Sequence, residues 1–138
     1  MKRLLLLLCA ALMLAGCAPK SDPSAQYASW LTGAEPIYVS EWPDNALTAA
    51  LPRPESGEID YIYDLSDSGH FAIYYKDISI EQGKAYLQAL KESGWTKIAS
   101  GDGGVSVGEL LQKGDTVLSA ALSEGILGLL ITQTAAQK

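Results

Sequence analysis

Apolar and polar residues follow three different patterns along this chain of 138 residues, and each pattern predicts a different kind of segment. An unbroken apolar run covers residues 4–14, a stretch without periodicity reaches about residue 36, and regular alternation begins at Gly57. A period of two predicts strands, whereas apolar residues three and four positions apart predict a helix. We therefore expect a leader at 1–16, a flexible tether at 17–36 and one folded domain at 37–138.

The alternation after Gly57 predicts a pair of antiparallel strands around the turn Ser66-Asp67-Ser68-Gly69. Glycine in the last position of such a turn readily takes a positive φ. The second strand alternates cleanly, and the first does so apart from Ile62. The residues expected on the buried side of the two half-buried strands are Ile59, Tyr61 and Tyr63 in the first and Phe71, Ile73 and Tyr75 in the second.

One amphipathic helix is predicted to follow this hairpin. Ser79 and Gln82 have the spacing of a capping box, in which each side chain accepts a hydrogen bond from the other residue's backbone N–H. Gly94 is placed to end the helix after about 14 residues. Its apolar side is formed by Ile80, Gly83, Leu87 and Leu90.

Further strands are predicted at 95–99, 105–112, 116–122 and 126–132, with a glycine-rich loop at 100–104. The last two strands are apolar on both faces, so we expect them to be central or covered on both sides. The predicted fold class is α+β, a mostly antiparallel sheet in the order β-β-α-β-β-β-β with one amphipathic helix packed on one face.

A proline-rich segment, 37–56, leads into these elements. Its three prolines at 43, 52 and 54 exclude a central strand or a regular helix. We expect an extended segment with turns, in which Trp42 and Leu51 cover an apolar surface.

The leader has the pattern of an export signal. A basic start, Met1-Lys2-Arg3, precedes the apolar run, which is shorter than the roughly 20 residues that span a membrane. The segment Leu14-Ala15-Gly16-Cys17 resembles the lipobox of bacterial lipoproteins. The resemblance implies cleavage between Gly16 and Cys17 and a diacylglycerol, with or without a further acyl chain, on Cys17. No other cofactor is predicted.

Cleavage would change the charge balance. It removes Lys2 and Arg3, which leaves eight basic residues against 16 acidic ones, a net charge of −8. Such a chain lacks the basic footprint that nucleic acid requires. Cys9 leaves with the leader and Cys17 is modified, so the domain must be stable without a disulfide.

The segments WPDN and LPRP, the strand FAIYYKDIS and the helix IEQGKAYLQALKESGW resemble those of a group of small bacterial lipoproteins. The shared features here are Trp42-Pro43, Lys76-Asp77, Ala85-Tyr86 with Leu90, and Gly94-Trp95, so the resemblance covers about residues 42–95. It implies an exported α+β domain, and it implies no catalytic residue.

No arrangement of residues in the domain predicts a catalytic or metal site. His70 is the single histidine and lacks the partners that a metal centre needs, so we interpret it as an exposed residue beside a turn. Asp60 and Asp64 share a face of one strand, which we interpret as solvated, and the run after Asp64 lacks the spacing of a calcium loop. Residues 101–104 precede a strand, whereas a glycine-rich phosphate loop precedes a helix.

The predicted function is a lipid-anchored, non-enzymatic interaction module on the extracytoplasmic face of the cell membrane, or of the outer membrane if the organism has one. Its candidate binding surface contains Trp42, Tyr74, Asp60 and Asp64, and its candidate partners are an envelope protein or a glycan. Two alternatives stay open. One is a small envelope hydrolase that uses Asp60 and Asp64, and the other is a homodimer formed through the apolar stretch 117–131.

Overall fold

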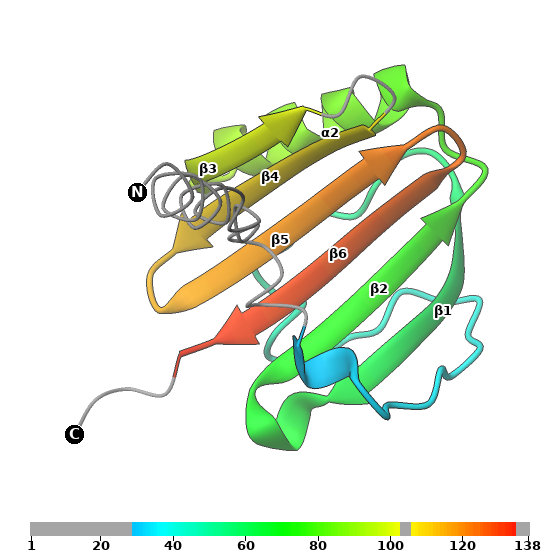
Figure 1. Ribbon diagram of the computed structural model, residues 1–138, viewed down its shortest axis with the longest axis vertical. Helices are drawn as coiled ribbons and strands as arrows, with labels where there is room; N and C mark the ends of the chain where they lie inside the picture. Colours follow the sequence, from blue (N-terminus) through cyan, green and yellow to red (C-terminus); the bar gives the residue numbers. More distant parts are fainter. Residues whose placement is uncertain (1–28, 103–105, 135–138) are drawn as a thin grey trace, which may run out of the picture.

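A six-stranded antiparallel sheet with one helix forms the fold in the computed structural model, which describes residues 29–102 and 106–134 (Figure 1). The predicted antiparallel sheet and amphipathic helix are therefore confirmed. The elements are η1 (Ser29–Leu31), β1 (Glu58–Leu65), η2 (Ser66–Ser68), β2 (His70–Lys76), α2 (Ile80–Glu92), β3 (Thr96–Asp102), β4 (Ser106–Lys113), β5 (Thr116–Ser123) and β6 (Ile126–Gln133). No helix in these ranges is long and apolar enough to cross a membrane.

The strands lie in the order β1-β2-β6-β5-β4-β3. The two strands that are apolar on both faces, β5 and β6, therefore occupy the centre, as the sequence predicts. Because β6 pairs with β2, the chain returns from its end to the strand of the first hairpin. This pairing joins the first hairpin and the last four strands into one sheet.

Helix α2 begins where the capping box predicts. Ser79 Oγ accepts a hydrogen bond from the Gln82 backbone N–H, and Gln82 Oε1 accepts one from the Ser79 backbone N–H. The helix ends before Gly94, whose φ of 97° is a conformation that glycine adopts without strain. Gly83 allows the helix to lie close to the sheet, because a Cβ there would meet Leu122 Cδ1 at 2.1 Å.

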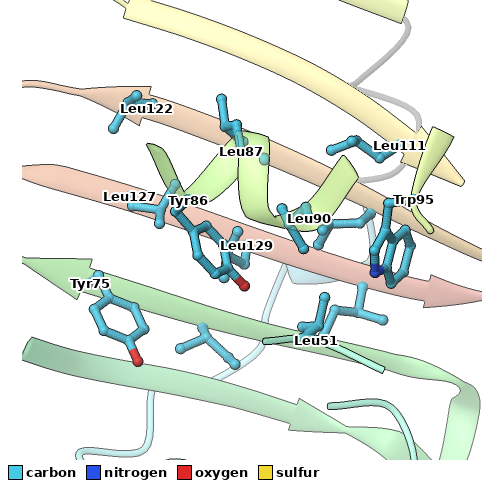
Figure 2. Packing of buried hydrophobic residues seen from close by; sticks show 14 of the residues in the cluster. Leu51, Tyr75, Tyr86, Leu87, Leu90, Trp95, Leu111, Leu122, Leu127 and Leu129 are labelled. Carbon is cyan, nitrogen blue, oxygen red and sulfur yellow. The ribbon is translucent and has the colours of Figure 1, made fainter. Parts of the chain in front are cut away.

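The core lies between the sheet and two covers, helix α2 and residues 37–56, which we call the strap (Figure 2). The strap contributes the buried side chains of Leu47 and Leu51. Two hydrogen bonds from side chains outside the strap hold its backbone: Tyr86 Oη donates to the Pro52 carbonyl at 2.9 Å, and Trp95 Nε1 donates to the Ala50 carbonyl at 3.1 Å. The prediction that the proline-rich segment covers apolar surface is thus confirmed for Leu51, and Trp42 packs partly buried against the same core.

The sequence prediction for the buried side of the first strand is confirmed for Ile59 and wrong from Tyr61 onward. The pairing with β2 shifts between Ile59 and Tyr61, which marks a β-bulge at Asp60. An extra residue in one strand reverses the alternation beyond it. Ile59 and Ile62 therefore belong with the core, whereas Tyr61 contacts Tyr74 on the other side of the sheet.

The predicted loop at 100–104 is also partly wrong. Strand β3 continues through residues 100–102, and Gly101 pairs with Gly108 of β4. Glycine-rich composition is typical of a loop, which is why the sequence misassigns this segment. In the structure the two glycines face each other across the ladder, and neither has a side chain to interfere with pairing. The rest of the predicted loop lies outside the described residues.

Candidate functional site

The sheet has two unlike faces, and the face opposite α2 is the candidate site. In Figure 1 this face points towards the viewer, and α2 and the strap lie behind the sheet. We call it the open face. Among residues 29–102 and 106–134, η1 is the one helical element on this side of the sheet. The strand register arranges its side chains in rows that cross all six strands.

Two rows cross the middle of the open face. The first row, from β1 to β3, is Tyr61, Tyr74, Gly128, Ala121, Gly108 and Gly101. The second row, in the same order, is Tyr63, Ala72, Leu130, Ser119, Leu110 and Ala99. Neither row contains an acidic or basic residue, so the middle of this face is uncharged in a chain that is acidic overall.

A groove of about 590 Å³ lies over the four strands with the small residues, β3 to β6. Its floor includes Gly101, Gly108, Ala121 and Gly128, and Tyr74 stands at its β2 end. Such a volume is within the range of ligand sites in proteins, roughly 300–1,000 Å³. The groove is thus a surface depression that ends at an aromatic side chain, Tyr74.

Two of the glycines in the floor, Gly101 and Gly108, are not required by the fold itself. A Cβ on Gly101 would meet no described atom within 4 Å, and one on Gly108 would meet the Gly101 carbonyl oxygen at 3.9 Å. Neither residue has a positive φ, so an alanine would fit at both positions without strain. Glycine weakens a strand and often marks a place where another molecule approaches the backbone closely. Packing within the described fold therefore does not explain these two glycines.

The glycine at position 128 is explained by a neighbouring side chain. A Cβ there would lie 3.0 Å from Cε1 of Tyr74, so the missing side chain makes room for that ring. The glycine allows the Tyr74 ring to pack closely against the backbone of β6. It therefore shapes the wall of the groove and not its floor alone.

The aromatic wall is a cluster of tyrosines on β1 and β2. Tyr61 stacks on Tyr74 with ring centroids 4.8 Å apart, and Tyr63 meets both rings edge-on at 5.7 and 6.0 Å. Each such pair contributes about 0.5–1.5 kcal/mol beyond burial. Burial, and then the neighbouring tyrosines, raise the pKa of Tyr61 and of Tyr74 above the usual 10. Tyr61 and Tyr74 are therefore neutral at physiological pH, and their hydroxyl groups can donate or accept hydrogen bonds.

One end of the open face is covered by η1. The ring of Trp30 stacks on the imidazole of His70 with centroids 4.9 Å apart, and His70 Nδ1 lies 3.3 Å from Thr132 Oγ1. His70 is accordingly half-buried, and the prediction of a freely exposed histidine is wrong. Part of the predicted tether, Trp30 in η1, thus contacts the domain.

The four residues of the predicted binding surface do not form one site. Trp42 lies on the core side, where it packs at 6.5 Å against Tyr75 and under the guanidinium of Arg53, beside a separate hollow of about 370 Å³. Tyr74 is on the open face and is the predicted residue that takes part in the groove.

The two carboxylates have local roles. Asp60 lies 3.7 Å from Lys76 Nζ as a surface ion pair, and Asp64 Oδ1 accepts hydrogen bonds from the backbone N–H and the hydroxyl of Ser66 at the turn. Among the described residues, no group of three or more His, Cys, Asp or Glu side chains is arranged to hold a metal ion. Gly16 and Cys17, the predicted cleavage and lipidation site, lie outside the described residues.

The small residues of the groove floor were absent from the sequence prediction. They are spread over four strands, and no local spacing connects them; only the register brings them into one row. Comparisons with protein-family models, with curated proteins and with solved structures find no match to this chain.

Proposed function

We propose that this protein is a lipid-anchored interaction module at the extracytoplasmic face of a cell membrane, and that the open face is its contact surface. In this proposal the order β-β-α-β-β-β-β separates two tasks: α2 and the strap complete the core on one face, and the other face meets a partner. Cys17 carries the lipid, and the chain between it and η1 acts as the tether. The partner is a component of the envelope, a protein or a glycan.

The observation that supports this proposal best is the first row of the open face. Two neutral, stacked tyrosines stand beside a floor of glycine and alanine, and at Gly101 and Gly108 no packing within the described fold calls for glycine. A sheet face that is apolar, uncharged and hollowed is typical of an interaction surface. Ala121 in the middle of this floor is exposed.

The contact surface can be tested in native membranes with a photoreactive residue. We would place p-benzoylphenylalanine at Ala121 on the open face and, as a matched control, at Ala85, which is exposed on the outer side of α2. The proposal predicts an adduct from position 121 that position 85 does not give. Equal or absent labelling at both positions would contradict the assignment of the open face.

The anchor is tested separately by fractionation. The Cys17→Ser variant should lose fatty-acid labelling and leave the membrane fraction, because a stable anchor requires the acyl chains. A variant that stays labelled and membrane-bound would refute the anchoring part of the proposal without touching the contact surface.

A further inference from the structure

We infer that the hollow beside Trp42 is a binding site for a neutral sugar ring. Its volume is about 370 Å³, at the lower end of the roughly 300–1,000 Å³ that is typical of ligand sites, so it suits a small ligand. No residue lines both this hollow and the groove on the open face, so the hollow is a second site. The inference is independent of the proposed contact surface and adds a class of ligand to the domain.

The indole of Trp42 forms one wall of the hollow, and the turn that follows it in the strap is firmly held. Asn45 Oδ1 accepts hydrogen bonds from the backbone N–H groups of Leu47 and Thr48. Thr48 Oγ1 in turn donates one to the Pro43 carbonyl at 2.7 Å. Leu47 and Thr48 are both buried, so the turn is fixed to the core. A wall that is ordered before a ligand arrives lowers the entropic cost of binding.

Tyr75 lines the hollow from β2 and brings a hydroxyl group to it. The residue is only 6% exposed, and no described residue forms a hydrogen bond with its hydroxyl. In Figure 2 this hydroxyl points away from Tyr86 and from the leucines of the core. Burial raises the pKa of Tyr75 to about 12, so the hydroxyl is neutral and both donates and accepts hydrogen bonds. Buried hydroxyls normally have a partner, and a ligand in the hollow would supply one.

The close approach of Gly57 to β2 fixes the relation between the two aromatic residues. Gly57 joins the strap to β1 with a φ of 80°, and a Cβ there would lie 2.8 Å from the Lys76 carbonyl oxygen and 3.4 Å from Tyr75 Cδ1. The rings of Trp42 and Tyr75 have centroids 6.5 Å apart and an interplanar angle of 49°. They therefore form a wedge, in which a ligand ring that lies on the indole brings its edge to the Tyr75 hydroxyl.

The charges around the hollow favour a neutral ligand over an ion. Glu58 lines the hollow and contributes a negative charge. Arg53 does not line it, but its Cζ lies 5.9 Å from the centroid of the Trp42 ring, and its positive charge partly offsets the rise in the pKa of Tyr75. A cationic ligand would therefore be repelled by Arg53, and an anionic ligand would be repelled by Glu58.

A sugar ring matches this lining. Its C–H face is apolar and packs on an aromatic ring, whose face carries the negative part of the quadrupole. Its hydroxyl groups donate and accept hydrogen bonds, and the hollow offers the hydroxyls of Ser40 and Tyr75 and the carboxylate of Glu58 as partners. A purely apolar ligand of the same size would leave these polar groups unpaired, which costs binding energy. The combination of an aromatic wall and neutral hydroxyls therefore points to a neutral sugar.

The test is an NMR titration of the isotope-labelled full chain in a zwitterionic detergent, because a detergent with a sugar head group would compete. The probes are the methyl glycosides of glucose, galactose, mannose and N-acetylglucosamine, each up to roughly 50 mM, which detects millimolar dissociation constants. The indole N–H resonance of Trp42 should shift with at least one probe. The resonance of Trp95, whose N–H is bonded to the Ala50 carbonyl, should not shift. An unchanged Trp42 resonance with all of these sugars would overturn the inference.

Two substitutions by phenylalanine test the part played by the Tyr75 hydroxyl. Tyr75→Phe keeps the ring and should weaken sugar binding by roughly 5- to 10-fold, the effect of one lost hydrogen bond. The matched variant Tyr38→Phe removes an exposed hydroxyl of the strap that does not line the hollow, and it should leave the affinity unchanged. Circular dichroism and the thermal midpoint show whether each variant is folded. A folded Tyr75→Phe variant with the affinity of the parent chain would contradict the assignment of the site.

Two ionic probes separate a sugar from a charged ligand. Tetramethylammonium stands for a cation that binds aromatic rings, and acetate stands for an anion that binds a guanidinium group. The inference predicts that neither ion shifts the Trp42 resonance at concentrations at which a sugar does. A shift with tetramethylammonium and none with the sugars would overturn the inference and assign the hollow to a cation. A shift with acetate alone would overturn it in favour of an anion at Arg53.

Discussion

Replacing Gly83 by alanine tests the close packing of α2 on the sheet. An alanine Cβ at this position would lie 2.1, 2.6 and 2.9 Å from Cδ1, Cδ2 and Cγ of Leu122. These are branches of a fully buried leucine, 1% exposed, so the side chain cannot turn into free solvent. The helix must move away from β5, or Leu122 must leave its rotamer.

Two opposing effects determine the magnitude. Overpacking of this kind costs about 1–3 kcal/mol. Glycine to alanine within a helix returns about 1 kcal/mol through helix propensity. The difference is about 0–2 kcal/mol, so we expect Gly83→Ala to lower the free energy of unfolding by up to about 2 kcal/mol, which for a domain of this size lowers the urea midpoint by up to roughly 1 M.

The assay is urea unfolding followed by circular dichroism, with a double-mutant cycle. Leu122→Ala removes the obstructing branches, so Gly83→Ala added to that background should raise the unfolding free energy by up to about 1 kcal/mol. Ala85→Gly, on the exposed side of α2, provides the control for propensity alone and should cost about 1 kcal/mol. A Gly83→Ala variant that raises the midpoint in the unchanged background would refute the close approach of helix and sheet.

Three further predictions concern the strap, the pH dependence and the stacked tryptophan. Tyr86→Phe removes the hydrogen bond to the Pro52 carbonyl and should cost about 1 kcal/mol in urea unfolding; an unchanged midpoint would show that this bond does not hold the strap. Burial raises the pKa of Tyr75 to about 12, so its neutral form is favoured in the folded state. The stability it contributes is complete below pH 10 and is lost as the pH rises from 10 towards 12, and Tyr75→Phe should flatten this loss relative to the parent chain; parallel pH profiles would contradict the shift. Trp30→Ala should release η1 and lower stability by about 0.5–1.5 kcal/mol, with increased solvent accessibility of the His70 ring by NMR; an unchanged His70 environment would count against the stack.

Local signals predicted the elements of this fold well. The capping box at Ser79 and Gln82 and the glycine at position 94 each satisfy backbone groups within a few residues, and such interactions can be recognised in a sequence. The central position of β5 and β6 follows from their apolar character on both faces. These predictions depend on short-range chemistry.

The β-bulge was harder to predict, although Ile62 carried its signal. Strict alternation put Tyr61 and Ile59 on one side, and Ile62 was the exception in that pattern. In the structure Ile62 is buried and the bulge at Asp60 restores the alternation from Tyr61 onward. An apolar residue that breaks the alternation of a strand can thus indicate a bulge. The sequence does not say whether the residues before the bulge or those after it follow the alternation of the core side.

The groove could not be predicted, because it is a property of register. Gly101, Gly108, Ala121 and Gly128 lie on four strands and become neighbours only when those strands pair as observed. The composition around Gly101 predicted a loop, because that residue belongs to a glycine-rich run. Tyr74 was recognised as a surface aromatic, whereas Trp42 was grouped with it and lies on the opposite face, in contact with Tyr75.

The measurement that tests the central claim most directly is hydroxyl-radical footprinting of the tyrosines on the open face. The chain would be labelled in native membranes and again as a dilute purified monomer, and the labelling normalised to peptides from the outer side of α2. If the open face is the contact surface, Tyr61 and Tyr63 should be protected in the membranes and reactive in the monomer. Equal reactivity of both tyrosines in the two preparations would contradict the account.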